Sequence, residues 1–220
     1  PEAIRLGSRG MRFIRLHAYK ASEALARERG AFPNLRQSRF AKKGPRLRNA
    51  TLTTIAPTGT LSLIAGCSSG IEPIFAPVYL REAAGMELRE IHPLFRQAAE
   101  KAGLASDDFF HEAGKRGSLR GITGVPEEMR RLFRTAHEIP PAEHVRMQAA
   151  FQKYTDNAVS KTVNLPESAT PADVEEVFLL AHRLACKGVT VYRYGTRPQP
   201  IRREEEPEVP LSCDRERICM

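Results

Sequence analysis

The sequence predicts an α/β fold, because segments with helical periodicity alternate with short β-branched segments along its 220 residues. Two short segments have the composition of strands, Thr162 to Leu165 and Val189 to Tyr192, and we expect the second to be buried. A third such run, Thr51 to Ile55, is also predicted to be a buried strand. A hydrophobic content of 41% is enough for a substantial core, and the length fits one domain or most of one.

The first element is predicted to be a helix, because its apolar residues recur at spacings of three and four and Gly30 follows them. The residues expected on its apolar face are Met11, Ile14, Ala18, Ala21 and Leu25. A basic loop is predicted over residues 31–48, which contain Pro33, Gly44 and Pro45. Beyond the strand at Thr51 to Ile55, another extended piece is expected at Ile74 to Leu80.

Four further helices are predicted in the middle of the chain, and proline marks the first turn of three of them. They are expected from Pro93 through Ala102 before Gly103, after the cap Ser106-Asp107-Asp108, from Pro126 with Met129, Leu132, Phe133 and Ala136 on the apolar side, and from Pro141 to about Ala158.

A last helix is predicted from its capping residues. Thr170 precedes Pro171, and Asp173 stands where an acid supports the cap. The apolar stripe is Val174, Val177, Ala181 and Leu184, and Gly188 is expected to end the helix.

The most informative local pattern is the turn Pro57-Thr58-Gly59-Thr60, which separates the predicted strand from a short apolar segment, Leu61 to Ala65. Proline fixes φ, glycine allows close approach of the backbone, and threonine hydroxyls add donors. If Leu61 begins a helix, its free N–H groups face the same spot, which is how chains bind phosphate. A turn that binds nothing is the alternative. The turn is not a Walker loop, because no Gly-Lys-Ser/Thr follows, and its glycine spacing does not match a dinucleotide fingerprint.

The net charge of +8 is unevenly distributed. Residues 1–50 hold 13 Lys and Arg against 3 Asp and Glu, a balance of +10, so the other 170 residues carry −2. This basic block predicts either a surface for nucleic acid or phosphates, or simply the solvated face of a helix.

The four cysteines are too few for a disulfide scaffold, so reduced thiols in a cytoplasmic protein are expected. Cys67 and Cys186 stand in apolar surroundings and are predicted to be buried. No membrane span or signal peptide is predicted, and the absence of an initial methionine suggests a processed or excerpted piece.

Five collinear stretches closely resemble the C-terminal part of the large catalytic chain of ribonucleotide reductases, over roughly Met11 to Arg197. They are Arg48–Thr51, Ile55–Thr60, Ala65–Pro73, His144–Thr162 and Cys186–Arg193. The resemblance implies that residues 1–197 form the C-terminal part of a ten-stranded α/β barrel, followed by a flexible charged tail over residues 198–220. It also implies that Pro57, Thr58, Gly59, Thr60 and Leu61 hold the diphosphate or triphosphate of a ribonucleotide substrate.

The resemblance is nearest to the adenosylcobalamin-dependent class. Iron-dependent relatives carry two adjacent tyrosines on the last barrel strand to relay a radical, whereas the comparable strand here is Val189 to Tyr192 with a single tyrosine. A cobalamin enzyme generates its radical next to the substrate and needs no relay. We expect Tyr192 to be an ordinary strand residue.

Several parts of the family's catalytic machinery are absent from this sequence. The radical cysteine and its carboxylate partner belong to an Asn-Pro-Cys-Gly-Glu segment, which this chain lacks. The first cysteine of the reducing pair and the allosteric site also belong to earlier regions of the family. The resemblance therefore implies a second chain or a preceding part that carries the radical cysteine, and a thioredoxin-like reductant. We expect the isolated chain to be inactive, and no catalytic residue is assigned to it.

Two further sites are considered. Cys213 and Cys219 in the tail suit a thiol–disulfide shuttle, but their spacing does not reproduce the family's usual tail pattern, which favours ordinary tail thiols. Glu72 is predicted to hold a loop through backbone hydrogen bonds rather than act as a base. The six histidines lack metal-ligand spacing, so no metal site is predicted.

Three functions thus follow from the sequence. The leading one is a part of a cobalamin-dependent ribonucleotide reductase that supplies the substrate-phosphate turn and barrel strands. The alternatives are a non-catalytic remnant that binds nucleotides and a basic nucleic-acid-binding module.

Overall fold

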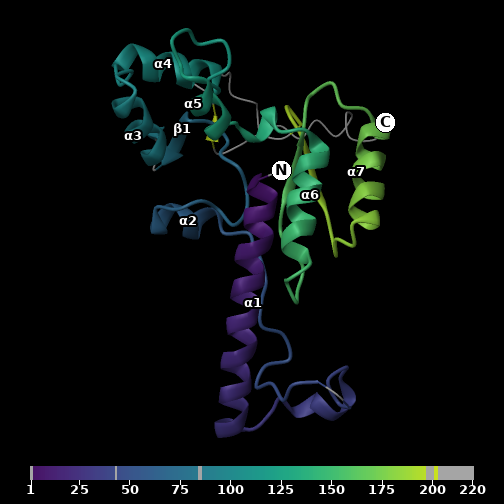
Figure 1. Cartoon of the computed structure of the whole chain (residues 1–220). Helices are drawn as coiled ribbons and strands as arrows, with labels where there is room; N and C mark the ends of the chain where they lie inside the picture. The colour runs from purple at the N-terminus through teal and green to yellow at the C-terminus, as the bar shows by residue number, and fades with distance from the viewer. Residues whose placement is uncertain (1, 43, 84–85, 197–200, 203–220) are drawn as a thin grey trace. The chain divides into compact units, whose positions relative to one another are not determined.

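A computed structural model of the chain describes residues 2–42, 44–83, 86–196 and 201–202 (Figure 1). It divides into two compact units. Unit 1 comprises Pro1–Glu72, Pro141–Val163 and Thr170–Val191, and unit 2 comprises Pro73–Pro140, Asn164–Ala169 and Tyr192–Met220. No helix in the described part of the chain is long and apolar enough to cross a membrane.

Unit 1 begins with the long helix α1, Glu2–Arg29, which ends at Gly30 with a φ of +80° as the sequence predicts. The predicted apolar face is only partly correct. Met11 is 2% exposed, but Ile14 is 53% exposed. Ser22 and Ala26 are the other buried residues of α1, since one narrow strip of this helix packs against the unit.

The segment after α1 is a loop with one short 3-10 helix, η1, Pro33–Gln37. Ser22 fixes its far end, because the Ser22 hydroxyl accepts the N–H of Arg48 at 3.0 Å and that of Asn49 at 3.2 Å. Leu47 is fully buried beside this contact. The predicted basic loop is therefore folded back onto α1 rather than free.

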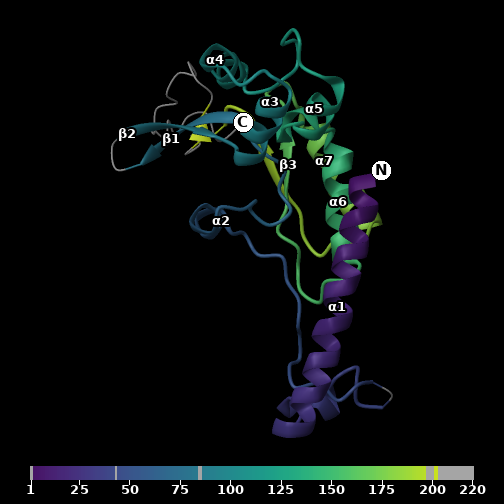
Figure 2. The same cartoon turned by 60° about the vertical axis from the view of Figure 1, so that its left-hand side comes forward.

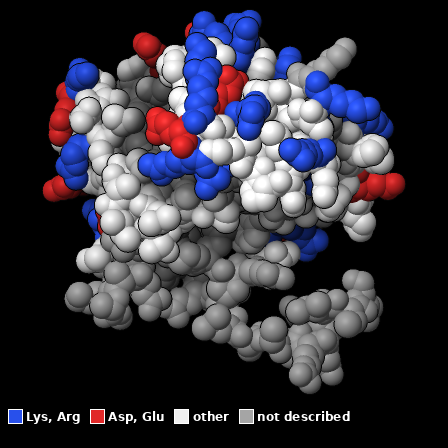
Figure 3. All heavy atoms as spheres, turned by 90° about the horizontal axis from the view of Figure 1, so that it is seen from below, with Lys and Arg blue, Asp and Glu red and all other residues white. Residues whose placement is uncertain are grey.

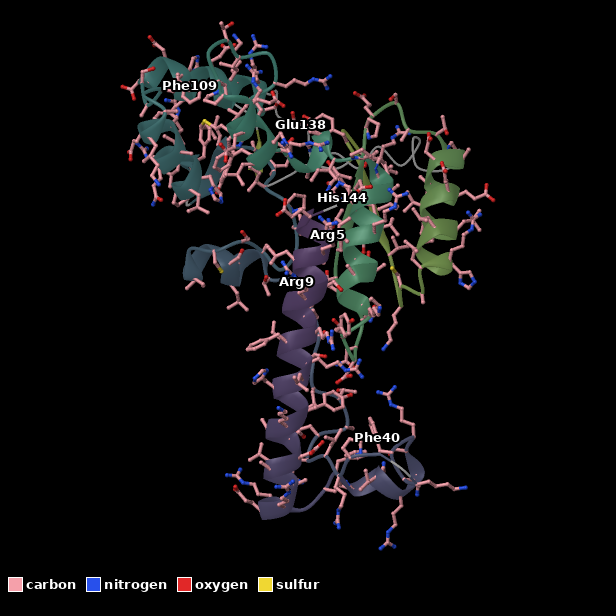
Figure 4. All side chains as sticks on the ribbon, viewed as in Figure 1. Arg5, Arg9, Phe40, Phe109, Glu138 and His144 are labelled. Atoms are coloured by element: carbon pink, nitrogen blue, oxygen red, sulfur yellow. The ribbon has the colours of Figure 1, made fainter. Side chains whose placement is uncertain are left out.

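Helix α6, Pro141–Gln152, packs between α1 and α7, Pro171–Arg183 (Figures 1 and 2). Its His144, labelled in Figure 4, is 1% exposed. The predicted end of α6 at about Ala158 is wrong, because Thr155 donates its hydroxyl hydrogen to the Phe151 carbonyl at 2.8 Å and turns the chain away.

Both ends of α7 are closed by specific hydrogen bonds. Thr170 and Asp173 form the predicted capping box. The helix ends at Arg183 rather than near Gly188, because Ala185 adopts a φ of +56° and closes a Schellman motif. In that motif the Cys186 N–H donates to the Ala181 carbonyl and the Ala185 N–H to the His182 carbonyl, both at 3.0 Å.

Strand β3, Thr162–Leu165, has the predicted bounds and pairs with β4, Thr190–Arg193, in a two-stranded sheet. Val163 and Leu165 are buried. The prediction that the second strand is buried is wrong, since its two end residues are exposed and its two middle residues only half-buried.

Unit 2 contains a three-stranded sheet of order β2-β1-β5. The antiparallel hairpin β1, Val78–Ala83, and β2, Met86–Ile91, pairs Val78 with Ile91. On the other edge of β1, the short strand β5, Ile201–Arg202, pairs Arg202 with Leu80. The described strands and helices confirm the predicted α/β mixture.

Helices α3, Pro93–Lys101, α4, Asp107–Arg116, and α5, Glu127–Leu132, cover the core of unit 2 and are followed by the 3-10 helix η2, Ala136–Glu138. The predicted stop at Gly103 and the cap at Ser106 are confirmed. Pro126 precedes α5 as its N-cap rather than beginning it. Leu132, predicted on the apolar side, is 71% exposed, because α5 is too short to bury two turns.

Aromatic rings fill this core. Phe95 is fully buried, and its ring centroid lies 5.3 to 5.9 Å from those of Phe109, Phe110 and Phe133. Two of these contacts are edge-to-face, the arrangement that aromatic quadrupoles favour. Phe109, labelled in Figure 4, packs at the margin of the cluster.

Candidate functional site

The predicted phosphate turn lies in unit 1, where the chain enters helix α2, Gly59–Ala65 (Figure 1). The sequence left open whether a helix follows the turn; the structure has one there, and it begins two residues earlier than Leu61. Pro57, Gly59, Thr60 and Leu61 are exposed and Thr58 is half-buried. The five residues assigned to phosphate binding thus form one accessible bend.

The backbone of this bend leaves three donors without a partner in the helix. The Ser62 N–H makes the first helical bond, to the Thr58 carbonyl at 2.8 Å, so the N–H groups of Gly59, Thr60 and Leu61 come before it. The Ser62 hydroxyl binds the Gly59 carbonyl at 2.7 Å and stabilises the turn. An acceptor from outside would meet these three N–H groups together.

Glycine at position 59 is not required by crowding within the chain. A Cβ built on Gly59 would meet no atom within 4 Å. Gly70, which closes the loop after α2, differs because its φ is +54° and its Cβ would lie 3.5 Å from the Ala56 carbonyl oxygen. The open space at Gly59 suits a ligand that approaches the backbone closely.

The predicted strand Thr51 to Ile55 is wrong in extent. A single parallel bridge joins Ile55 to Val159, and only Thr53 is buried. A side chain here replaces the backbone acceptor that a neighbouring strand would supply. The Asp156 carboxylate accepts the Leu52 N–H at 2.9 Å.

The segment from Asp156 to Ser160 holds the approach to the turn. The Asp156 N–H donates to the Thr53 hydroxyl at 2.9 Å, and the Tyr19 hydroxyl of α1 donates to the Asp156 carboxylate at 2.9 Å. Backbone bonds from Asn157 to the Thr53 carbonyl at 3.0 Å and from Ser160 to the Ile55 carbonyl at 2.8 Å complete the attachment. Hydrogen bonds to the Asp156–Ser160 segment therefore hold the residues that lead into the turn at a fixed position.

Two glutamines that lie four residues apart on α6 hold the Asp156–Ser160 segment in place. The fully buried Gln148 donates its amide hydrogens to the carbonyls of Val159 at 3.2 Å and Gly188 at 2.6 Å. Gln152 donates to the carbonyls of Thr155 and Asn157. Each side chain replaces backbone bonds that irregular segments cannot make for themselves.

An ion pair between the buried Lys161 and the half-buried Glu72 fixes the other side of the turn. The Lys161 ammonium, 2% exposed, lies 2.5 Å from Glu72 Oε2 and 2.7 Å from the Thr162 carbonyl, and the Thr162 N–H donates to Glu72 Oε1 at 2.6 Å. The predicted structural role of Glu72 is confirmed. Burial lowers the pKa of Lys161, because desolvation outweighs the attraction of Glu72.

The prediction of two buried cysteines is wrong. Cys67 is exposed, because α2 ends at Ala65 and the loop carries it to the surface. Cys186 is half-buried in the Schellman motif after α7, and desolvation raises the pKa of its thiol. Cys213 and Cys219 lie outside the described residues, so their shuttle role stays a prediction.

The remaining candidates are simpler. In the described part of the chain, no three or more His, Cys, Asp and Glu side chains are grouped to hold a metal ion. Tyr192 is a half-buried residue of β4.

Comparison with known proteins identifies the family. Residues 42–192, more than half of the chain, match the sequence model described as "Ribonucleotide reductase, barrel domain". The chain belongs to the ribonucleotide reductase barrel family. The matched residues include the phosphate turn, the Asp156–Ser160 segment and the Glu72–Lys161 pair.

Relatives in this family include the "Vitamin B12-dependent ribonucleoside-diphosphate reductase" of Mycobacterium tuberculosis (strain CDC 1551 / Oshkosh), which is 47% identical over 96% of the chain. The protein of the same name from Thermoplasma acidophilum is 47% identical over 87%. This reductase barrel segment spans 32% and 25% of their lengths. The solved structure of the Actinobacillus ureae class Id ribonucleotide reductase alpha subunit matches 88% of the chain, and 35% of that subunit, with a TM-score of 0.73 and 22% identity. This likeness shows the fold.

Sequence reasoning placed the turn but not the residues that support it. Lys161, Gln148 and Asp156 lie within the His144–Thr162 stretch, where family resemblance was noted without individual roles. The pair of glutamines four residues apart on one predicted helix was an available signal, because such side chains share a helix face.

Proposed function

We propose that this chain is part of a vitamin B12-dependent ribonucleoside-diphosphate reductase, which reduces ribonucleotides to deoxyribonucleotides for DNA replication. Within that enzyme it supplies barrel strands and the substrate-phosphate turn. The observation that carries the proposal is the accessible bend at Pro57–Leu61, with three N–H groups free of helical bonds, in a chain of this family. Two relatives at 47% identity carry the name of this enzyme.

The bend would bind the substrate by its diphosphate. A phosphate oxygen placed before α2 accepts hydrogen bonds from the N–H groups of Gly59, Thr60 and Leu61, and the Thr60 hydroxyl adds another. The Asp156–Ser160 segment and the Glu72–Lys161 pair hold the bend at a fixed place in unit 1. This rigidity orients the ribose, because an anchored phosphate restricts the positions of the sugar.

Adenosylcobalamin would supply radical chemistry in the complete enzyme. No residue in the described part of the chain is assigned to hold the corrin. We therefore derive no step through it. The sequence lacks the Asn-Pro-Cys-Gly-Glu segment, so the radical cysteine is assigned to another part of the enzyme, and a thioredoxin-like protein is its proposed reductant. A cytoplasmic location remains part of this proposal.

A chimera tests the function. Residues 42–192 replace the corresponding segment of the Mycobacterium tuberculosis relative, which provides the rest of the chain. We expect the chimera to form deoxycytidine diphosphate from cytidine diphosphate (CDP) when adenosylcobalamin and dithiol are present. The isolated 220-residue chain is expected to form none.

The control is the same chimera with Thr58 and Thr60 changed to Val. Its KM for CDP should rise about tenfold or more, since a hydrogen bond to a charged group contributes about 1.5–3 kcal/mol. A chimera that folds and binds cobalamin but does not reduce CDP would contradict the proposal.

The alternatives are less well supported. The arginines of α1 are mostly exposed, as on the solvated face of a helix. Figure 3 shows basic side chains interspersed with acidic and uncharged ones on the face seen from below, rather than one continuous basic surface. Membership of the reductase family favours catalysis over a nucleic-acid-binding module or a non-catalytic remnant.

A further inference from the structure

A cluster of arginine side chains lies in unit 2, far along the sequence from the phosphate turn. A cavity of about 450 Å³ is lined by Arg120, Glu127, Arg130, Arg131, Arg134 and Glu138. Glu138 is labelled in Figure 4. Four guanidinium groups against two carboxylates give the lining a formal charge of +2.

Arg130 builds the wall of this arginine cavity. Its guanidinium donates to three backbone carbonyls: Nε to Val125 at 3.2 Å, Nη1 to Leu119 at 3.2 Å and Nη2 to Ile122 at 2.6 Å. These bonds tie the loop before α5 to the helix itself. They also hold a positive charge at a fixed position, and no carboxylate of the described residues lies within 4 Å of its nitrogens.

Glu138 does not neutralise the arginines by pairing with them. Its Oε1 accepts the Ser118 hydroxyl at 3.0 Å, and its Oε2 accepts the N–H and the hydroxyl of Thr135 at 2.9 and 3.0 Å. Arg134 binds the Glu138 backbone carbonyl rather than its carboxylate. Glu138 is thus committed to the capping box of η2.

The remaining guanidiniums are available. Among the described residues, no carboxylate lies within 4 Å of a nitrogen of Arg120, Arg131 or Arg134, and the side chains of Arg120 and Arg131 make no hydrogen bond. All three residues are exposed at the cavity. Arginines gathered without acidic partners repel one another, so an anion between them would be strongly favoured.

We propose that the arginine cavity is a binding site for a phosphoryl anion, distinct from the substrate turn, in which Arg120, Arg131 and Arg134 donate to phosphate oxygens. Guanidinium forks match phosphate geometry with two parallel hydrogen bonds each. The cavity volume accommodates a diphosphate group, and the fixed charge of Arg130 adds long-range attraction. The ligand is either free pyrophosphate or the diphosphate of a nucleotide.

The test uses the full chain with ¹⁵N-labelled arginine and inorganic pyrophosphate as the probe. Side-chain Nε–Hε signals are followed by NMR and assigned by single Arg→Lys variants. We expect the signals of Arg120 and Arg131 to shift saturably. Arg27 and Arg29, exposed in the last turn of α1, are the internal control and should not shift.

Variants then separate site binding from general charge. R120Q/R131Q should weaken the pyrophosphate response of Arg134 at least about tenfold, because two charge-assisted hydrogen bonds are lost. The matched variant R27Q/R29Q, with the same loss of charge, should leave it unchanged. Far-UV circular dichroism checks that each variant is folded.

Titration with adenosine diphosphate distinguishes the two sources of the anion. Equal affinity for both ligands supports a site for the phosphoryl group alone, and at least tenfold tighter nucleotide binding supports a nucleotide site. Equal shifts of Arg27 and Arg29, or no effect of R120Q/R131Q, would overturn the proposal. So would binding of duplex DNA without a response to either small ligand. The amides of Gly59 and Thr60 report the turn separately.

Discussion

Lys161 illustrates how a single side chain decides the geometry of the turn. Its ammonium is removed from water and is compensated by Glu72 and by the Thr162 carbonyl. An ion pair with one buried partner contributes little net stability, but loss of either side chain leaves the other charge without its ionic partner. Glu72 alone was interpretable from the sequence, because its partner lies 89 residues further along the chain.

The first prediction follows from this pair. Lys161→Met should destabilise the chain by roughly 1–3 kcal/mol, because the half-buried Glu72 carboxylate loses its cation and the Thr162 carbonyl loses a donor. Glu72→Gln should also destabilise the chain, because the buried Lys161 ammonium then keeps only the Thr162 carbonyl, and the double variant should recover part of the loss. Urea unfolding of the four proteins gives the coupling free energy, and strictly additive costs would contradict the role of the pair.

A second prediction concerns alkaline pH. The pKa of Lys161 lies below its ordinary value of 10.5 in the folded chain. As pH rises, the folded state therefore loses the Lys161 proton at a lower pH than the unfolded state does. Between the folded pKa and 10.5, the free energy of unfolding that Lys161 contributes increases with pH. We expect the stability of the wild type relative to Lys161→Met to increase over that window in urea unfolding. A constant difference would contradict the assignment.

At the scale of elements, α6 positions the turn through its side chains. Gln148 bonds the carbonyls of Val159 and Gly188, which belong to the segments before β3 and β4. Its Oε1 is buried and has no hydrogen-bond partner. Gln148 therefore stabilises the fold through its two N–H donors, whereas its buried, unpaired oxygen lowers the stability.

The third prediction is that Gln148→Leu destabilises the chain by about 1 kcal/mol, because two carbonyls lose their donors while a buried oxygen is removed. The exposed Gln97 of α3 supplies the matched control. Gln97→Leu should change the free energy of unfolding by less than about 0.5 kcal/mol. Equal effects of the two substitutions in thermal unfolding would refute the positioning role.

Helix α7 gives a prediction at acidic pH. Hydrogen bonds from the Thr170 backbone and hydroxyl lower the pKa of Asp173 from its ordinary value of 3.8. Its stabilisation is therefore present above pH 3.8 and is lost as pH falls through the folded pKa. The Tm of the wild type should exceed that of Asp173→Ala at pH 6, and the gap should narrow in acid. A gap that is constant with pH would contradict the capping box.

Helix starts could be predicted more reliably than helix ends. The Thr170 box and the Ser106 cap are local patterns, and both were confirmed. The ends of α6 and α7 depend on the Thr155 hydroxyl and on Ala185 with its positive φ, so composition gave no warning. The run Thr51 to Ile55 has strand propensity, but its neighbour Asp156 replaces ladder bonds with side-chain bonds.

At the scale of the whole molecule, the chain spans about a third or less of its relatives' lengths. This accounts for large apolar side chains that are exposed in the described part of the chain. Phe13 and Leu16 of α1 are 63% and 52% exposed, and Ile64 of α2 is 79% exposed. In a longer reductase we expect other barrel segments to cover them.

We predict that these residues make the isolated chain self-associate. Phe13→Ser with Leu16→Ser should lower the average mass in light scattering, because less apolar surface is available, and should leave the Tm nearly unchanged. The exposed pair Leu179→Ser and Phe178→Ser on α7 is the comparison. An unaltered mass for both variants would show that neither face drives association.

The fold class and the turn could be predicted because they rest on contiguous residues. The Glu72–Lys161 pair and the arginine cavity could not, because each brings together side chains whose contacts are fixed only by packing. Of the cysteines, Cys67 was misplaced because its apolar neighbours belong to an exposed helix.

The most direct test of the phosphate turn is amide NMR of the ¹⁵N-labelled chain titrated with CDP and, separately, with cytidine. We predict that the N–H signals of Gly59, Thr60 and Leu61 shift saturably with CDP and not with cytidine. CDP binding that leaves those three signals unmoved, or equal shifts with cytidine, would contradict the account.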